Sequence, residues 1–159
     1  MALGDNTLRS AAGNSQRGRN PYMVQTTLNW ATALSDKTTA LAASDVIPVI
    51  AVPKGTMVLN AGIEVDTATD GSTFTVDLGM VDADVFVDGF DATSAAGVVA
   101  QNPAAYQPVM AVADDNIDVT IATLSGGAVT SGKFRIWAVL MDCTDMGDTA
   151  ADEVARDQA

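Results

Sequence analysis

Four aspartates lie close together near the middle of the chain, where carboxylates could bind a cation or transfer protons. They are Asp82, Asp84, Asp88 and Asp91, set among Val, Phe, Ala and Gly. A calcium ion takes about six to eight oxygen ligands, and the helix–loop–helix calcium loop needs acids at alternating positions followed directly by a glycine. Counted from Asp82, the positions that should hold the third acid and the glycine are Phe86 and Val87. The sequence therefore lacks that calcium motif.

The same aspartates could instead supply a pair of catalytic carboxylates. General acid–base catalysis needs one carboxyl group with a raised pKa in a cleft, and the chain has few aromatic residues to line a sugar cleft. On a strand, Asp82, Asp84 and Asp88 would share one face, and Asp88-Gly89 is typical of a turn. We therefore predict a solvated strand and turn, with no catalytic, cofactor-binding or metal-binding residue. Calcium binding by the four aspartates is the alternative.

The absence of one residue type excludes several kinds of active site. The chain has no histidine, which removes the commonest general base and the commonest transition-metal ligand. Ser-His-Asp and Cys-His chemistry are excluded with it. Cys143 is the single cysteine, so no intrachain disulfide can form, and we expect a free, buried thiol. The sequence thus predicts a protein that is not an enzyme and that uses no cofactor.

The charge and hydropathy of the chain limit its partners. Twenty acidic residues stand against eight basic ones, for a net charge of −12. Nucleic-acid binding needs clustered Lys and Arg, and no such cluster is present, so we expect no nucleic-acid partner. No run approaches the ~20 apolar residues of a membrane span, and the first twenty residues lack the apolar core of a signal peptide. We expect synthesis in a cytoplasm and no membrane partner.

Alternating apolar and polar residues predict β-strands through most of the chain. The clearest alternations cover residues 22–30, 57–65, 74–78, 117–121 and 134–140. The second of them should place Met57, Leu59 and Ala61 on one face. Pro48 lacks an N–H, so it predicts an edge strand or a bulge. Seven or eight strands without a helix are typical of a β-sandwich or barrel.

Two connections and the two chain ends complete the organisation. Pro53 and Gly55 fit the second and last positions of a type I turn, and the poorly patterned stretch 91–109 predicts a loop with one short strand near Val109. Residues 1–20 are rich in Gly and Asn and carry a mildly positive charge, which suggests an arm that is either disordered or ordered by a partner. We predict this arm, a β-sandwich domain at 21–142, and an acidic tail at 143–159.

Several segments resemble one family of virion proteins. The succession "VPKGT", "VLNAGIEV", a Thr/Val-rich strand and "DADVFVDGFD", with "SGKFRIWAVLMD" near the end, is similar to the capsid cement, or decoration, proteins of tailed bacteriophages, above all those of marine and cyanobacterial phages. The resemblance covers about Asp45 to Asp142. It implies a jelly-roll-like β-sandwich that forms a homotrimer on the outer surface of the capsid. There it would clamp neighbouring subunits of the major capsid protein.

The positive arm is the expected capsid contact. Arg9, Arg17 and Arg19 could pair with capsid carboxylates, while Leu8, Tyr22 and Met23 could add apolar anchors. Two other functions remain open: a host-facing glycan-binding module of the virion, and a head-fibre or tail subunit. A glycan array would test the first, and the copy number per particle would test the second.

Overall fold

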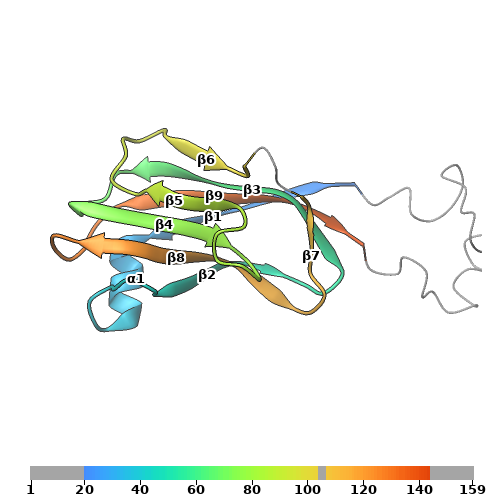
Figure 1. The fold of residues 1–159 in the computed structure, drawn as a ribbon, viewed down its shortest axis with the longest axis horizontal. Coiled ribbons are helices and arrows are strands. Elements are labelled where there is room, and N and C mark those ends of the chain that lie inside the picture. The colour runs from blue at the N-terminus through green and yellow to red at the C-terminus, as the bar shows by residue number, and fades with distance from the viewer. Residues whose placement is uncertain (1–19, 104–106, 144–159) are drawn as a thin grey trace, which may run out of the picture.

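The computed structural model describes residues 20–103 and 107–143. Within them there are nine strands and one helix, and the strands form two antiparallel sheets packed face to face (Figure 1). The elements in chain order are β1 (Tyr22–Asn29), α1 (Trp30–Lys37), β2 (Val46–Val52), β3 (Thr56–Thr67), β4 (Thr73–Gly79), β5 (Val87–Asp91), β6 (Val99–Gln101), β7 (Val109–Met110), β8 (Asp115–Ser125) and β9 (Lys133–Asp142). The predicted all-β sandwich is confirmed.

The strand order is that of a jelly roll. Sheet A runs β1-β9-β3-β6, with β7 also paired to β3, and sheet B runs β2-β8-β4-β5. The pairs are nested along the chain: β4 with β5, β3 with β6, β2 with β8 and β1 with β9. A nested ribbon whose strand pairs alternate between two sheets is the jelly-roll arrangement. The topology therefore agrees with the jelly-roll-like expectation as well as with the sandwich.

The core lies between the sheets and follows the period of two that the sequence displays. Ile117, Val119 and Ile121 of β8 are fully buried, as are the alternate residues 134, 136 and 138 of β9. Trp30 anchors one end of this core, because its ring meets the edges of Phe74 and Phe134 at centroid separations of 4.8 and 5.4 Å. Edge-to-face pairs add about 0.5–1.5 kcal/mol each beyond their area burial, so few aromatics suffice here.

Three further sequence predictions are confirmed. β2 is an edge strand of sheet B, and its register shifts between Pro48 and Ile50, so both effects expected of Pro48 are present. A two-residue strand lies at Val109. Cys143 is a free, buried thiol. The sequence analysis did not predict β6, because its three residues are too few to show an alternation of apolar and polar side chains.

The expectation that the body contains no helix is wrong. Residues 30–37 form α1, directly after β1. The Asn29 side chain accepts a hydrogen bond from the Ala31 N–H at 3.0 Å and so caps the first turn, while Thr38 ends the helix in the left-handed region at φ 61°. An Asn cap satisfies an otherwise unpaired N–H of the first turn. The alternation of β1 continues as far as Trp30, which hid this cap in the sequence.

The predicted face of β3 is wrong over its first half. Val58 and Ala61 are buried, whereas Met57 and Leu59 are half-buried. The register of β3 against β9 shifts between Val58 and Asn60, and one extra residue in a strand exchanges its two faces beyond that point. Met57 therefore lies on the outer face of sheet A.

The turn between β2 and β3 also differs from the expected type. The Thr56 N–H donates to the Pro53 carbonyl at 3.1 Å, so Pro53 is the first residue of the turn and Gly55 the third. Gly55 has a φ of +84°, which is the conformation that a type II turn requires at that position and that glycine adopts without strain.

Both ends of the described body lie at the same end of the sandwich, which we name the terminal end. Tyr22 is opposite Leu140 in the register of β1 and β9, so β1 begins where β9 finishes, on the right of Figure 1. Nearly all of the predicted arm and tail lies outside the described residues. Among those that are described, no helix has the length and apolar character to cross a membrane.

Candidate interaction surfaces

The aspartate stretch is exposed and has no cation-binding geometry. Asp82 and Asp84 lie in the loop between β4 and β5, while Asp88 and Asp91 lie in β5. The expectation that Asp82, Asp84 and Asp88 share one strand face is therefore wrong. Within the described parts of the chain, no three acidic or Cys side chains are grouped as metal ligands would be. All four aspartates are solvent-exposed, as the solvated interpretation predicts.

Asp88-Gly89 makes a bulge inside β5, not the predicted turn. Val76 is opposite Phe90 and Leu78 is opposite Val87, so two residues of β5 face one residue of β4. Gly89 has a φ of +62°, and its N–H donates to Asp77 Oδ1 at 2.7 Å. A bulge with glycine in the left-handed region bends the strand and raises its twist. The Asp-Gly pair thus indicated correctly that the backbone departs from a regular strand at Gly89, but the departure is a bulge within β5 and not a turn.

Several other aspartates hold loops together. Asp70 accepts hydrogen bonds from the Thr130 N–H at 2.9 Å, from the Thr130 hydroxyl and from the Ser131 N–H. The hydrogen bond from the Thr130 side chain is the largest effect that lowers the pKa of Asp70, to about 2. Asp70 therefore links the β3–β4 connection to the β8–β9 connection, a role that sequence alone did not suggest.

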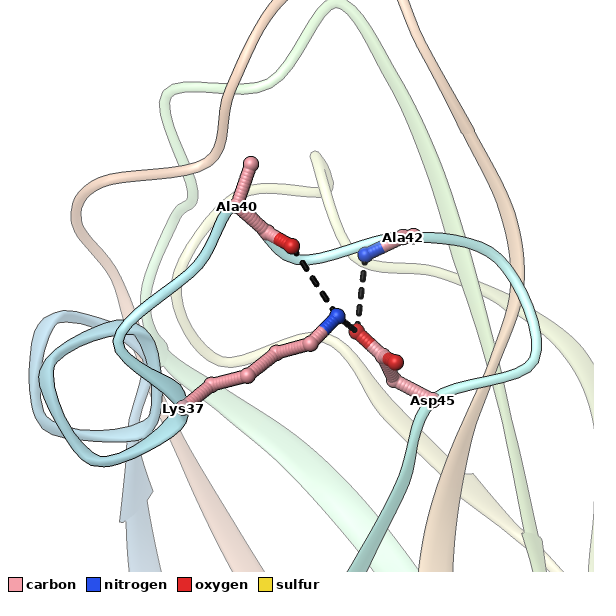
Figure 2. A network of polar contacts seen from close by, with 4 residues as sticks. All are labelled: Lys37, Ala40, Ala42 and Asp45. Atoms are coloured by element: carbon pink, nitrogen blue, oxygen red, sulfur yellow. Dashed lines mark hydrogen bonds and ion pairs between the residues drawn. The ribbon is translucent and has the colours of Figure 1, made fainter.

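A second aspartate closes the loop between α1 and β2 (Figure 2). Lys37 Nζ donates to the Ala40 carbonyl at 2.9 Å and to the carboxylate of Asp45, which also accepts from the Ala42 N–H at 2.8 Å. The hydrogen bond from Lys37 is the main reason why the pKa of Asp45 is lowered. The network is structural, since each of its polar atoms binds another part of the same loop.

One shallow hollow of about 430 Å³ lies between the end of β2 and the start of β8. Its lining includes Asp114 and Asp115. Asp114 already accepts the Lys54 N–H at 2.9 Å, and Asp115 accepts the Asn116 N–H at 2.8 Å. Burial, with a smaller effect from the nearby Asp115 charge, raises the pKa of Asp118 further along β8. Both carboxylates of the hollow thus accept hydrogen bonds from nearby backbone N–H groups.

The outer face of sheet A carries a row of apolar side chains near the terminal end. Met57 of β3 is opposite Met141 of β9 on one side and Met110 of β7 on the other; we name these three the methionine row. Directly opposite residues of an antiparallel pair have Cβ atoms about 4.5–5.5 Å apart, so the row is continuous across three strands. Met23 and Val139 form the neighbouring pair. Met23 is 63% exposed.

Trp137 extends this apolar area along the sheet. Gly62 is its partner on β3, and a Cβ added to Gly62 would come within 2.5 Å of the indole ring. Glycine at this position thus lets the indole cover the backbone of β3. The same register row contains Gln25 and Gln101, on β1 and β6. Trp, Met and Arg are enriched in protein interfaces, and Arg135 precedes Trp137 by two residues on the same face.

The outer face of sheet B differs in charge and in side-chain type. Its four strands contain no Lys or Arg and five aspartates, of which positions 77, 88, 91 and 118 face outward, while Asp115 pairs with the inward-facing Val52. Threonines such as Thr73, Thr75 and Thr123 face outward on β4 and β8, and small apolar residues do so on β2. The strands of sheet A instead hold Lys133 and Arg135 against three acidic residues, and Arg135 contacts Glu64 and Asp66 at 3.1 and 3.8 Å.

Only two of the predicted capsid-contact residues lie in the described chain. Tyr22 and Met23 are the first residues of β1, at the terminal end, and both are exposed. Met23 lies on the outer face beside the methionine row, whereas Tyr22, opposite the buried Leu140, points to the other side of the sheet. Leu8, Arg9, Arg17 and Arg19 lie outside the described residues. The methionine row escaped the sequence analysis, because its members are far apart in the chain and the bulge at Leu59 conceals the face of Met57.

Comparison with known proteins finds the fold in phage capsids. No protein-family model and no curated protein matches the chain. A chain of the cyanophage Pam1 capsid has a TM-score of 0.60 at 17% identity, covering 88% of this chain and 97% of that one. A chain from the capsid of Ralstonia phage GP4 has a TM-score of 0.57 at 15% identity, covering 86% and 91%.

A third chain with this fold comes from the acidic stable capsid structure of Helicobacter pylori bacteriophage KHP30. Its TM-score is 0.52 at 14% identity, over 76% of this chain and 86% of that one. All three solved structures are phage capsids, and each match spans most of both chains. The three similarities show that the fold of this chain also occurs in phage capsid structures.

Proposed function

We propose that the chain is a structural virion protein that binds the outer surface of an assembled phage capsid and clamps neighbouring subunits of the major capsid protein. The observation that carries the proposal is the match, over most of the chain, to chains of three phage capsid structures. The sequence resemblance to capsid cement proteins supports the position on the outer surface and the homotrimer.

The contact with the shell is assigned to the terminal end. The methionine row, Tyr22 and Met23 lie at that end, and Asn20, the first described residue, directly precedes β1 there. Met side chains adapt to irregular partner surfaces, and the Arg residues of the arm would add charge-assisted contacts. In this proposal residues 1–20 act as the arm, 21–142 as the rigid body and 143–159 as the tail.

Stabilisation of the shell would come from the addition of modest contacts. A homotrimer engages several capsid subunits at once, so the later contacts gain from a high effective concentration. A protein that binds only the assembled shell stabilises that shell by mass action. Adhesion of this kind requires no turnover and no cofactor.

Co-sedimentation of the purified protein with expanded, undecorated phage heads tests the proposal. We expect saturable binding and a higher temperature at which the decorated heads disrupt. A variant that lacks residues 1–20 should bind more weakly and keep the same circular dichroism spectrum. Failure of the full-length protein to sediment with the heads at any concentration would reject the proposal.

One observation favours a second candidate, a glycan-binding module of the virion. Trp137 is half-buried, with Gln25 and Gln101 in the same register row, and an aromatic ring flanked by amides is suited to stack on and hydrogen-bond a sugar ring. A glycan array with the wild-type protein and with Trp137→Ala tests this candidate. Binding that the substitution abolishes would support it.

A further inference from the structure

We propose that copies of this chain associate with one another through one side of the sandwich, the side formed by β1 and β2. We name these two strands the uncharged wall. The inference rests on the proposed function in one respect: that function requires several copies of the chain to bind one another as a homotrimer. The wall lies where sheet A and sheet B each end, and its two strands contact one another.

The wall is set apart by its charge. β1 reads YMVQTTLN and β2 reads VIPVIAV, without a single charged residue. Every other strand longer than three residues contains at least one. In a chain with a net charge of −12, two copies repel one another wherever acidic surfaces meet. A contact between identical copies therefore costs least at a surface without charge, and this argument favours a second copy over an unspecified partner.

The edge of β1 is also the most open of the sheet edges. Edge strands with unpaired N–H and C=O groups attract further strands, and proteins usually block them with proline, charge, bulges or short length. β2 has Pro48 and a bulge, β5 has a bulge and two aspartates, and β6 and β7 have three and two residues. β1 has none of these features, and its eight residues pair with β9 without a break in register.

No backbone hydrogen bond occupies the free side of β1 within the described part of the chain. Strand addition to such an edge gives affinity through main-chain hydrogen bonds. β1 also has the composition of a strand that needs covering, since it has several β-branched and apolar residues and lacks Pro and Gly. Val46 at the start of β2 is 57% exposed and adds apolar area beside it. A neighbouring copy would pair with the free backbone N–H and C=O groups of β1 and would cover this apolar area.

The test compares two double variants that change the net charge by the same amount. Thr27→Glu with Val46→Glu places carboxylates on the uncharged wall, and Thr27 is opposite Arg135, which can pair with the new carboxylate within the monomer. Thr73→Glu with Thr123→Glu places two carboxylates on exposed strand positions of sheet B and serves as the control. Light scattering during gel filtration measures the mass of each protein.

We expect the wild-type protein and the control variant to have the same mass, a whole-number multiple of 16.3 kDa, and the wall variant to run as a monomer with an unchanged spectrum. Hydrogen exchange gives a second measurement that needs no variant: on dilution of the wild-type protein, amides of β1 should lose protection before those of β8. A monomeric wild-type protein, or a wall variant that keeps the wild-type mass, would overturn the inference.

Binding to phage heads separates this inference from the proposed function. An oligomeric wild-type protein that fails to sediment with heads would reject the function and leave the wall as the contact between copies. A monomeric protein that sediments with heads would reject the inference, and the homotrimer with it, and leave the attachment to the capsid.

Discussion

The outer faces of the two sheets differ more than any other two regions of the molecule. Both sheets supply alternate residues to one apolar core, so their inner faces are similar. Outside, sheet A presents the methionine row and Trp137 with nearly balanced charges, whereas sheet B presents threonines and four aspartates without a basic residue. The core fixes one face of each strand and leaves the other free, so the free faces indicate where a partner binds.

The largest expected effect comes from charge placed in the methionine row. Met57→Asp with Met141→Asp should weaken binding to phage heads by about 30-fold or more, the effect of removing interface residues worth about 2 kcal/mol. Thr75→Asp with Thr120→Asp on sheet B is the matched pair and should leave binding within about threefold of wild type. Equal losses of binding in the two variants would contradict the proposal that sheet A, and not sheet B, contacts the capsid.

A second effect should arise where Trp137 covers Gly62. Gly62→Ala places a Cβ within 2.5 Å of the indole and 2.8 Å of the Ala100 carbonyl, so unfolding free energy should fall by about 1–3 kcal/mol. In a Trp137→Ala background the same substitution should cost less, because one of the two clashing groups is absent. Urea denaturation of the four proteins measures this coupling. Additive losses would mean that the indole does not constrain position 62.

A smaller effect should follow from the loop contact of Asp70. Its pKa in the folded protein, about 2, is below the ordinary aspartate value of 3.8, so ionised Asp70 stabilises the fold above pH 3.8, and this contribution disappears as the pH falls towards 2. Asp70→Asn should lower Tm by about 1–3 °C at pH 7, because an exposed carboxylate contributes little. Thermal melts of both proteins should converge near pH 2. A gap that stays constant across this range would contradict the assignment.

The smallest effect is expected from calcium. The four aspartates are exposed and are divided between the β4–β5 loop, which holds Asp82 and Asp84, and β5, which holds Asp88 and Asp91. Melts with millimolar calcium and with a chelator should therefore give the same Tm. A shift of several degrees, lost on changing Asp88 and Asp91 to Asn, would restore the calcium alternative.

The periodic part of this fold could be predicted from the sequence, because alternation records which face of a strand is buried. It placed β8 and β9 and their core residues correctly, and Pro48 indicated an edge strand. The bulge at Leu59 could not be predicted, since it depends on how β3 meets β9 rather than on any local signal. Asn29 was a readable helix cap, but the alternation of β1 runs on to Trp30 and obscured it.

The candidate surfaces were less predictable than the fold for a related reason. The methionine row joins positions 57, 110 and 141, which become neighbours only through the registers of β3, β7 and β9. Tyr22 and Met23 were singled out from the sequence, and both are exposed at the terminal end, with Met23 beside that row. Their role in capsid binding, and that of Leu8, Arg9, Arg17 and Arg19, stays a prediction.

Because β1 begins where β9 finishes, residues 20 and 143, through which any fusion at a terminus is joined to the sandwich, both lie at the end that carries the methionine row. The exposed Gly126-Gly127 connection between β8 and β9 lies at the far end of the sandwich. Under the proposed function, that connection is the better insertion point for foreign cargo on a phage particle, because it lies opposite the end assigned to the shell contact.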